Sequence, residues 1–352
     1  MTDIIRIPKD DLHNVCRAAF ERVGVPRDDA DAAADILVVG DLMGISTHGT
    51  RRVIIYCQRI LDGAIVADPK ITIDERSPCL AVIDGGNGMG PVIGSRGVAA
   101  AVRLAKESGM AYVGCRNSHH FGPVAPYSAR ACDAGMVSLM GTNTQPVMAP
   151  WRGAAVVHGN NPIGIAAPRR DDPPFILDMA QSVVAFSKLR HAHEAGETIP
   201  EGWAADADGH VTTDPLKGMK GWVLPIGGHK GYGLALAVDM LSGVLSGGQA
   251  ATGVNQLFRR DETPQGVSHF FIALDPARLL GAEAYYEQME TFCQTIKATP
   301  AADPDLPVLI PGEPEAASMA ETLKAGIPMP RERFEDIQRI ADGKQPRTMP
   351  DQ

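Results

Sequence analysis

Apolar side chains near the start of the chain recur at helical spacing. Between Leu12 and Val23 they fall three or four positions apart, so they share one face of a helix, and Gly24 ends the run. Two further segments show the same periodicity before Asp62-Gly63, and a polar stretch around His48 separates them. The pattern therefore predicts helices over 12–23, 29–43 and 52–61, with His48 at the junction that precedes the third.

The pattern changes after Asp68-Pro69, where short apolar runs alternate with helical periodicity. Such alternation is typical of an α/β fold. The predicted strands are 79–84, 111–115, 136–140, 163–167, 175–178 and 268–274. The predicted helices are 94–108, 127–134, 232–245, 285–296, 315–325 and 331–340. We expect an α/β domain over 76–274, inserted between mainly helical segments at 1–75 and 275–352 that form a second domain.

Composition and charge narrow the class of protein. A chain of 352 residues with 44% hydrophobic and 21% charged residues has the balance of a soluble globular protein. Its net charge of -9 argues against general nucleic-acid binding, and no apolar run is long enough for a membrane span. Six scattered cysteines show no metal-ligand spacing. These features predict a reduced, cytoplasmic protein without a metal site.

The glycine-rich segment 85–90 follows a predicted strand and precedes a helix, as a Rossmann phosphate loop does. Its glycines lie at 85, 86, 88 and 90, so the G-x-G-x-x-G spacing is not met. The next strand runs into Cys115-Arg116-Asn117, without the acidic residue that would hold a ribose. This segment is interpreted as a structural loop.

Five polar islands interrupt the apolar sequence and combine proton-transfer or anion-binding side chains with glycine. They lie at 46–52, 117–122, 160–162, 177–180 and 227–233. In the first, His48 can exchange a proton near neutral pH, and Arg52, four residues on, can hold a carboxylate. The simpler alternative is that His48 caps the third helix and Arg52 faces solvent. Islands of this composition are what an enzyme site requires.

The other islands leave alternatives open. His120 and Thr144 follow strand ends, where α/β proteins collect ligand sites, although ordinary turn chemistry also fits. Asp178 ends an apolar strand and would cap a helix running through Ser182. Lys230 lies in a glycine-rich lead into a helix, which is a generic anion cradle without the Walker spacing.

Taken together, these islands resemble the NAD(P)-dependent malate/L-lactate/L-sulfolactate dehydrogenase family. That family includes ureidoglycolate dehydrogenases, 2,3-diketo-L-gulonate reductases and Δ1-piperideine-2-carboxylate reductases. The motifs that carry the resemblance span nearly the whole chain, and they read STHGTRR, RNSHHFG, MAP, HGNNPIG, LDMA, IPEGWAADADGHVTTDP, GGHKGYG and IPGE. The resemblance implies a non-Rossmann dinucleotide-binding α/β domain and a homodimer.

The resemblance also implies roles for individual residues. His48 matches the proton donor or acceptor, Arg52 the carboxylate-holding residue, and His120 a second catalytic position. The cofactor would contact His120, Thr144, Asn161, Asp178, Met179, Ala180, Lys230, Gly231, Pro311, Gly312 and Glu313, and the substrate would contact Ser46, Arg52 and Met148. The chain departs from the family pattern at Thr50, at Trp151-Arg152 and at 158–160, so a relative's substrate is not transferred.

The leading hypothesis is an oxidoreductase that moves a hydride between NAD or NADP and a small 2-oxo or 2-hydroxy acid. One alternative is reduction of a cyclic 2-imino acid, and another is a non-catalytic dinucleotide-binding protein. Lys188 and Arg190 could meet the 2′-phosphate of NADP, but they fit equally well as solvated helix charges. We expect a small carboxylate as the partner molecule, with no nucleic acid and no membrane.

Overall fold

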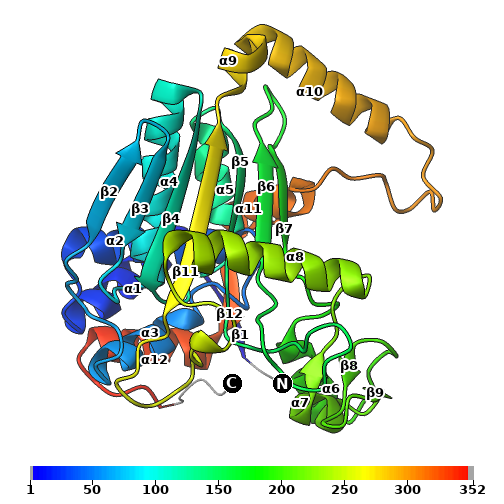
Figure 1. Ribbon diagram of the computed structural model, residues 1–352. Coiled ribbons are helices and arrows are strands. Elements are labelled where there is room, and N and C mark those ends of the chain that lie inside the picture. Colours follow the sequence, from blue (N-terminus) through cyan, green and yellow to red (C-terminus); the bar gives the residue numbers. More distant parts are fainter. Residues whose placement is uncertain (1–2, 348–352) are drawn as a thin grey trace.

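The computed structural model describes residues 3–347, in which a helical layer is built from both ends of the chain (Figure 1). Strand β1 (Ile4–Ile7) pairs with β12 (Ile327–Pro330), so the first and last segments lie side by side. The helices of this layer are α1 (Lys9–Arg22), α2 (Arg27–Leu42), α3 (Arg52–Leu61) and α12 (Arg331–Ala341). They enclose one apolar cluster that includes Leu12, Leu37, Val53 and Ile337.

Beside this layer stands a seven-stranded sheet in the order β2-β3-β4-β11-β5-β6-β7. Its strands are β2 (Thr72–Ser77), β3 (Leu80–Asp84), β4 (Met110–Ser118), β11 (Val267–Leu274), β5 (Val137–Thr142), β6 (Ile163–Ala167) and β7 (Phe175–Met179). The β3–β4 pair is parallel, and the other five neighbouring pairs are antiparallel. The predicted α/β fold is confirmed.

Successive residues of the central strand β11 face opposite sides of the sheet, which follows from the period of a strand. Phe271 packs beside Gly97 of α4 (Gly90–Ser108), and α5 (Ala125–Asp133) covers the same side. Phe270 points the other way, toward Val238 of α8 (His229–Asp239). Helix α8 lies across this second face and continues into a π-helical turn, Met240–Val244 (Figure 1).

Two smaller units project from the sheet (Figure 1). The first is a small sheet with two helices, made of β8 (Ala204–Ala205), β9 (Val211–Thr212), β10 (Trp222–Val223), α6 (Phe186–Ala195) and α7 (Pro215–Lys220). The second is an arm formed by α9 (Pro276–Leu280) and α10 (Ala282–Lys297), after which the chain returns to α11 (Glu313–Ala325). A short 3₁₀ turn lies at Ala251–Gly253. Across residues 3–347, none of the helices combines the length and apolarity needed to cross a membrane.

One predicted helix is wrong. Strand β7 runs through Asp178 to Met179, residues 180–185 are not helical, and the next helix begins at Phe186. Asp178 does cap a helix, but that helix is α5, because its Oδ2 accepts the backbone N–H groups of Val124 (2.9 Å) and Ala125 (2.8 Å). Asp178 therefore caps a helix other than the predicted one, and the two residues that it caps lie 53 and 54 residues away along the chain.

Candidate active site

A cavity of about 380 Å³ lies between the start of α3, the ends of the sheet strands and the loop that precedes β11. His48, Arg52 and His120 line one end, and Thr144, Asp178 and Glu315 are also among its lining residues. The volume falls in the range of small-molecule sites. Six residues from five separate segments of the sequence therefore meet at one cavity.

The turn that carries His48 is fixed by a buried carboxylate. Asp41 is 6% exposed, and its Oδ2 accepts both the backbone N–H (3.0 Å) and the hydroxyl (2.5 Å) of Thr50. A side chain at Gly49 would collide with that carboxylate, which explains the glycine. Burial raises the pKa of Asp41 to about 6, against the hydrogen bonds from Thr50 that lower it. Thr50, which departs from the family pattern, is thus an internal anchor.

Arg52 begins α3 and enters the cavity without an acidic partner among residues 3–347. Its guanidinium carbon lies 5.6 Å from the ring centre of Phe258, and its buried Nε has no hydrogen-bond partner there. Burial lowers the pKa of Arg52 to about 10; Tyr56 raises it, while the nearby Arg51, Arg190 and Arg333 lower it further. This end of the cavity is therefore cationic and lacks a counter-ion.

A second arginine of α3, Arg59, holds the loop that carries Phe258. Arg59 is fully buried, and its guanidinium donates to the backbone carbonyls of Arg259, Asp261 (2.9 Å) and Thr263. These carbonyls belong to the loop that presents Phe258 to Arg52. Arg59 thus fixes the position of the Phe258 ring.

The two histidines of the cavity stack on each other, with ring centres 5.4 Å apart and planes inclined by 20°. Burial, followed by the charges of Arg52 and Arg51, lowers the pKa of His48 to about 3. Burial, Arg52, His48 and His269 hold the pKa of His120 well below its usual range. Both rings are neutral at physiological pH, and each can hydrogen-bond to a ligand.

A second group of lining residues, here called the Asp178 end, follows strand ends, while the group with His48, Arg52 and His120 is called the Arg52 end. Thr144, whose hydroxyl lies 3.0 Å from Oδ1 of Asn160, follows β5, and Asn160 precedes β6. Burial raises the pKa of Asp178 to about 6, opposed by the N–H groups of Ala125 and Val124, while Glu315 also raises it. The Asp178 end offers acidic and amide groups where the Arg52 end offers cations.

Several predicted site residues lie outside the cavity lining, at other places within residues 3–347. Asn161 uses its amide internally, since Oδ1 accepts the N–H of Thr144 (2.9 Å) and Nδ2 donates to Ala235 (2.8 Å). Met148 is fully buried in an apolar cluster, and Ser46 is exposed. The other predicted residues that lie outside the lining are Met179, Lys230, Gly231, Pro311, Gly312 and Glu313. Ala180 does line it.

Glu313 and Lys230 show two different environments. Glu313 forms an ion pair with Lys297 (2.5 Å) and accepts a hydrogen bond from the N–H of Ile310 (3.0 Å), so its carboxylate is already engaged at the start of α11. Lys230 is exposed in the first turn of α8, beside the positive-φ residues Gly227 and Gly228. Both lie in the segments assigned to cofactor binding, which stays a prediction.

Sequence reasoning missed four residues that shape the site. Tyr56 bonds to His120, Gln265 accepts the His120 backbone N–H (2.9 Å), and Phe258 and Asn160 line the cavity. Tyr56 follows Arg52 by four residues, so the helical spacing that paired His48 with Arg52 could have identified it. Gln265 and Phe258 lie in a loop whose approach no local pattern predicts.

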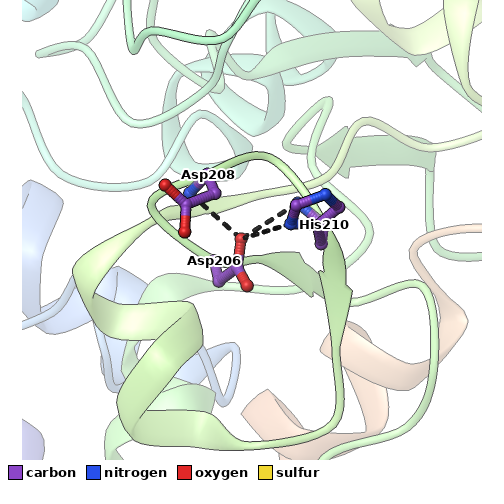
Figure 2. Close-up of side chains that lie close together, drawn as sticks. All are labelled: Asp206, Asp208 and His210. Atoms are coloured by element: carbon purple, nitrogen blue, oxygen red, sulfur yellow. Dashed lines mark hydrogen bonds and ion pairs between the residues drawn. The ribbon is translucent and has the colours of Figure 1, made fainter.

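Away from the cavity, three polar side chains gather at the turn between β8 and β9: Asp206, Asp208 and His210 (Figure 2). Oδ1 of Asp206 accepts the backbone N–H groups of Asp208 (3.0 Å) and His210 (2.9 Å). Asp208 and His210 are exposed. The carboxylate of Asp206 therefore stabilises the turn to which it belongs.

Comparisons with known proteins show the family to which the chain belongs. Residues 7–338 match the family described as malate/L-lactate dehydrogenase. Malate dehydrogenase from Pyrococcus horikoshii is 38% identical over 96% of this chain and 95% of its own length. Ureidoglycolate dehydrogenase (NAD(+)) from Escherichia coli O157:H7 is 29% identical over 92% of each chain. The structure of sulfolactate dehydrogenase from Methanocaldococcus jannaschii superposes with a TM-score of 0.90 at 34% identity, over 97% of this chain and 98% of that one. The chain therefore belongs to the malate/L-lactate dehydrogenase family and is an oxidoreductase.

Proposed function

We propose that this enzyme transfers a hydride between NAD or NADP and a small 2-oxo or 2-hydroxy acid, with Arg52 holding the carboxylate and His48 carrying the proton. Malate, sulfolactate and ureidoglycolate, the substrates named for its relatives, are 2-hydroxy acids. The observation that carries the proposal is a guanidinium that has no acidic partner within residues 3–347, beside a neutral imidazole in one cavity.

We expect the carboxylate of the substrate to bind to the guanidinium of Arg52. A guanidinium presents N–H groups in a planar fork that matches the two oxygens of a carboxylate. Phe258 lies against the guanidinium and restricts its orientation. Because Arg52 has no acidic partner among the described residues, an incoming carboxylate displaces no existing ion pair.

The proton is assigned to His48. A neutral imidazole can accept the proton of a 2-hydroxy acid as the acid is oxidised. In the reductive direction the same group must give a proton. A carboxylate bound at Arg52 offsets one of the charges that lower the pKa of His48, so substrate binding itself favours the protonated ring.

A bound nicotinamide supplies the hydride in reduction and accepts it in oxidation. Thr144, Asn160, Asp178 and Glu315 would meet the cofactor, because they line the same cavity and offer hydroxyl, amide and carboxylate groups. Asp178 uses Oδ2 to cap α5, which leaves Oδ1 for a hydroxyl or amide donor. The exposed Lys230 at the start of α8 is the proposed contact for the pyrophosphate.

We also propose that the enzyme is a homodimer. Apolar side chains are exposed along α8 with its π-helical turn and along the arm, among them Met240 (52%), Val244 (65%), Leu279 (74%) and Phe292 (53%). A second copy of the chain would remove them from water. Sedimentation of the purified enzyme tests this, since a monomer across the micromolar range would contradict it.

The catalytic proposal is tested by following NADH and NADPH oxidation with pyruvate, oxaloacetate and a cyclic imino acid. We expect turnover with at least one 2-oxo acid and loss of it in the His48→Ala variant. Turnover with the imino acid alone would replace the substrate class. Silence with every acid, under conditions in which the dinucleotide binds, would contradict the proposal.

A further inference from the structure

The ring of His120 lies between His48 and Tyr56, and each contacts a different part of it. His48 stacks on its face, whereas the Tyr56 hydroxyl lies 2.5 Å from its Nδ1. Tyr56 is 1% exposed and belongs to α3, one helical turn after Arg52. The buried hydroxyl of Tyr56 therefore lies within hydrogen-bond distance of one ring nitrogen of His120, which lines the cavity.

A backbone group decides which way this hydrogen bond runs. The N–H of Gly122 points at the same Nδ1, at 3.3 Å, and a backbone N–H can only donate. Nδ1 is therefore an acceptor and carries no proton. Burial, opposed by Arg52 and the Gly122 N–H, raises the pKa of Tyr56 above its usual range, so its hydroxyl stays protonated and donates a hydrogen bond to Nδ1. Because the ring is neutral, its single proton must lie on Nε2.

His48, the other histidine that lines the cavity, is not fixed in this way. Nδ1 of His48 lies 2.9 Å from the hydroxyl of Thr47, which can either donate or accept. A hydroxyl can rotate to suit either tautomer, whereas the Gly122 amide cannot.

We propose that Tyr56 is a positioning residue that holds His120 in the Nε2–H tautomer, so that His120 donates a hydrogen bond to the substrate oxygen and does not accept its proton. The inference rests on the proposed function and deepens it, because it divides the work between the two histidines. His48 exchanges the proton, and His120 polarises the carbonyl as a neutral donor.

The chemistry of the neutral ring supports this division. An imidazole whose Nδ1 is already accepting two hydrogen bonds has no free lone pair for the proton of a 2-hydroxy acid. Giving up the Nε2 proton would leave an imidazolate, which is strongly unfavourable in a buried site. A neutral histidine that acts as an electrophile, rather than as an acid, is an established catalytic arrangement in other enzymes.

The test is the ¹⁵N NMR spectrum of the enzyme labelled at histidine, with the His120 signals identified by their loss in His120→Gln. We expect Nδ1 of wild-type His120 to have the shift of an unprotonated nitrogen and Nε2 that of a protonated one. The spectrum of the wild type decides the tautomer even if a variant fails to fold. A proton on Nδ1 would overturn the proposal.

The role of Tyr56 is tested by Tyr56→Phe with Tyr127→Phe as the matched control. Tyr127 is also fully buried, and its hydroxyl donates to the Phe121 carbonyl at 2.5 Å. We expect Tyr56→Phe to mix the His120 tautomers and to lower kcat about three- to tenfold, the value of one neutral hydrogen bond. The control should leave the tautomer unchanged.

An unchanged tautomer in Tyr56→Phe, or the same change in Tyr127→Phe, would contradict the positioning role. These spectra need no substrate, so they decide the inference independently of the assay. A wild-type enzyme that oxidises no 2-hydroxy acid and reduces no 2-oxo acid would overturn the proposed function, while the tautomer would still be measured.

Discussion

Two groups of residues that line the cavity, the Arg52 end and the Asp178 end, differ in charge, and yet each depends on a buried carboxylate. At the Arg52 end a buried carboxylate, Asp41, accepts two hydrogen bonds from Thr50 just before α3. At the other end Asp178 accepts two backbone N–H groups at the start of α5. In both cases burial raises the pKa of the carboxylate to about 6. Each end of the site thus depends on an acidic side chain that anchors a helix start.

The difference lies in what each anchor leaves for a ligand. Asp41 lies outside the cavity lining, so the cationic groups near His48 face the ligand without a carboxylate beside them. Asp178 lines the cavity and adds its own charge to that end, together with Glu315. This asymmetry directs an anionic substrate to the Arg52 end and leaves hydroxyl and amide donors, which a dinucleotide carries, to the Asp178 end.

Replacing the proton carrier should have the largest effect. We expect His48→Ala to reduce kcat by about 10²–10⁴-fold, the usual contribution of a general acid–base group. The dissociation constant of the dinucleotide should stay within about twofold, because the dinucleotide is assigned to other residues than His48. Steady-state kinetics and fluorescence titration measure the two. If kcat is retained, the proton role passes to His120 and the division of work fails.

Weakening the carboxylate grip should come next. Arg52→Lys keeps the charge but removes the planar fork, so KM for 2-oxo acids should rise about tenfold or more. The control is Arg51→Lys, which changes a neighbouring cation that lies outside the cavity lining. Similar KM values for the two variants would mean that the Arg52 end provides charge without a specific contact.

Asp178 makes stability depend on pH in a defined direction. Its pKa is about 6 when folded and 3.8 as the reference value, so its favourable contribution is present below pH 3.8 and is lost as pH rises through 6. The free energy of unfolding of Asp178→Asn, relative to wild type, should therefore increase between pH 5 and 7.5, by about 1–1.5 kcal/mol. Urea unfolding at the two pH values measures this. A decrease would reverse the sign and contradict the buried-carboxylate account.

The smallest effects separate the proposed cofactor contact from the glycine loop. Lys230→Ala should raise the dinucleotide dissociation constant about threefold, since the residue is exposed and its charge is screened by solvent. Gly88→Ala should instead destabilise the fold by about 1–3 kcal/mol, because a side chain there would collide with Pro69. Titration of the dinucleotide and thermal unfolding distinguish the two. A larger loss of dinucleotide binding in Gly88→Ala than in Lys230→Ala would contradict this assignment and place the pyrophosphate over the 85–90 loop.

Local patterns were sufficient for most of the fold. The predicted helix 52–61 coincides with α3, and 94–108 lies within α4, which begins earlier at Gly90. Gly90, the first residue of α4, lies so close to the His119 and His120 carbonyls that a Cβ there would collide with them. No local signal predicts such an approach, and this is why helix boundaries were less accurate than helix positions.

The same limit of local patterns applies to the site residues. His48, Arg52, His120, Thr144, Asp178 and Ala180 were assigned from sequence and do line the cavity. The resemblance assigned Asn161 and not Asn160 to the cofactor, and the sequence gives no indication of which amide turns inward. In the structure, Asn161 joins Thr144 to Ala235 and Asn160 faces the cavity. The choice depends on a backbone turn, with φ of 29° at Asn161, that composition does not reveal.

A crystal structure with NADPH and a 2-oxo acid analogue such as oxamate tests the opposite assignments of the two ends most directly. The account predicts the carboxylate of the analogue on the guanidinium of Arg52, with its carbonyl oxygen between His48 and Nε2 of His120. It predicts the dinucleotide along Asp178, Met179 and Ala180, with the pyrophosphate near Lys230 and Gly231 and the 311–313 turn alongside. A carboxylate bound away from Arg52, or a pyrophosphate over residues 86–90, would contradict it.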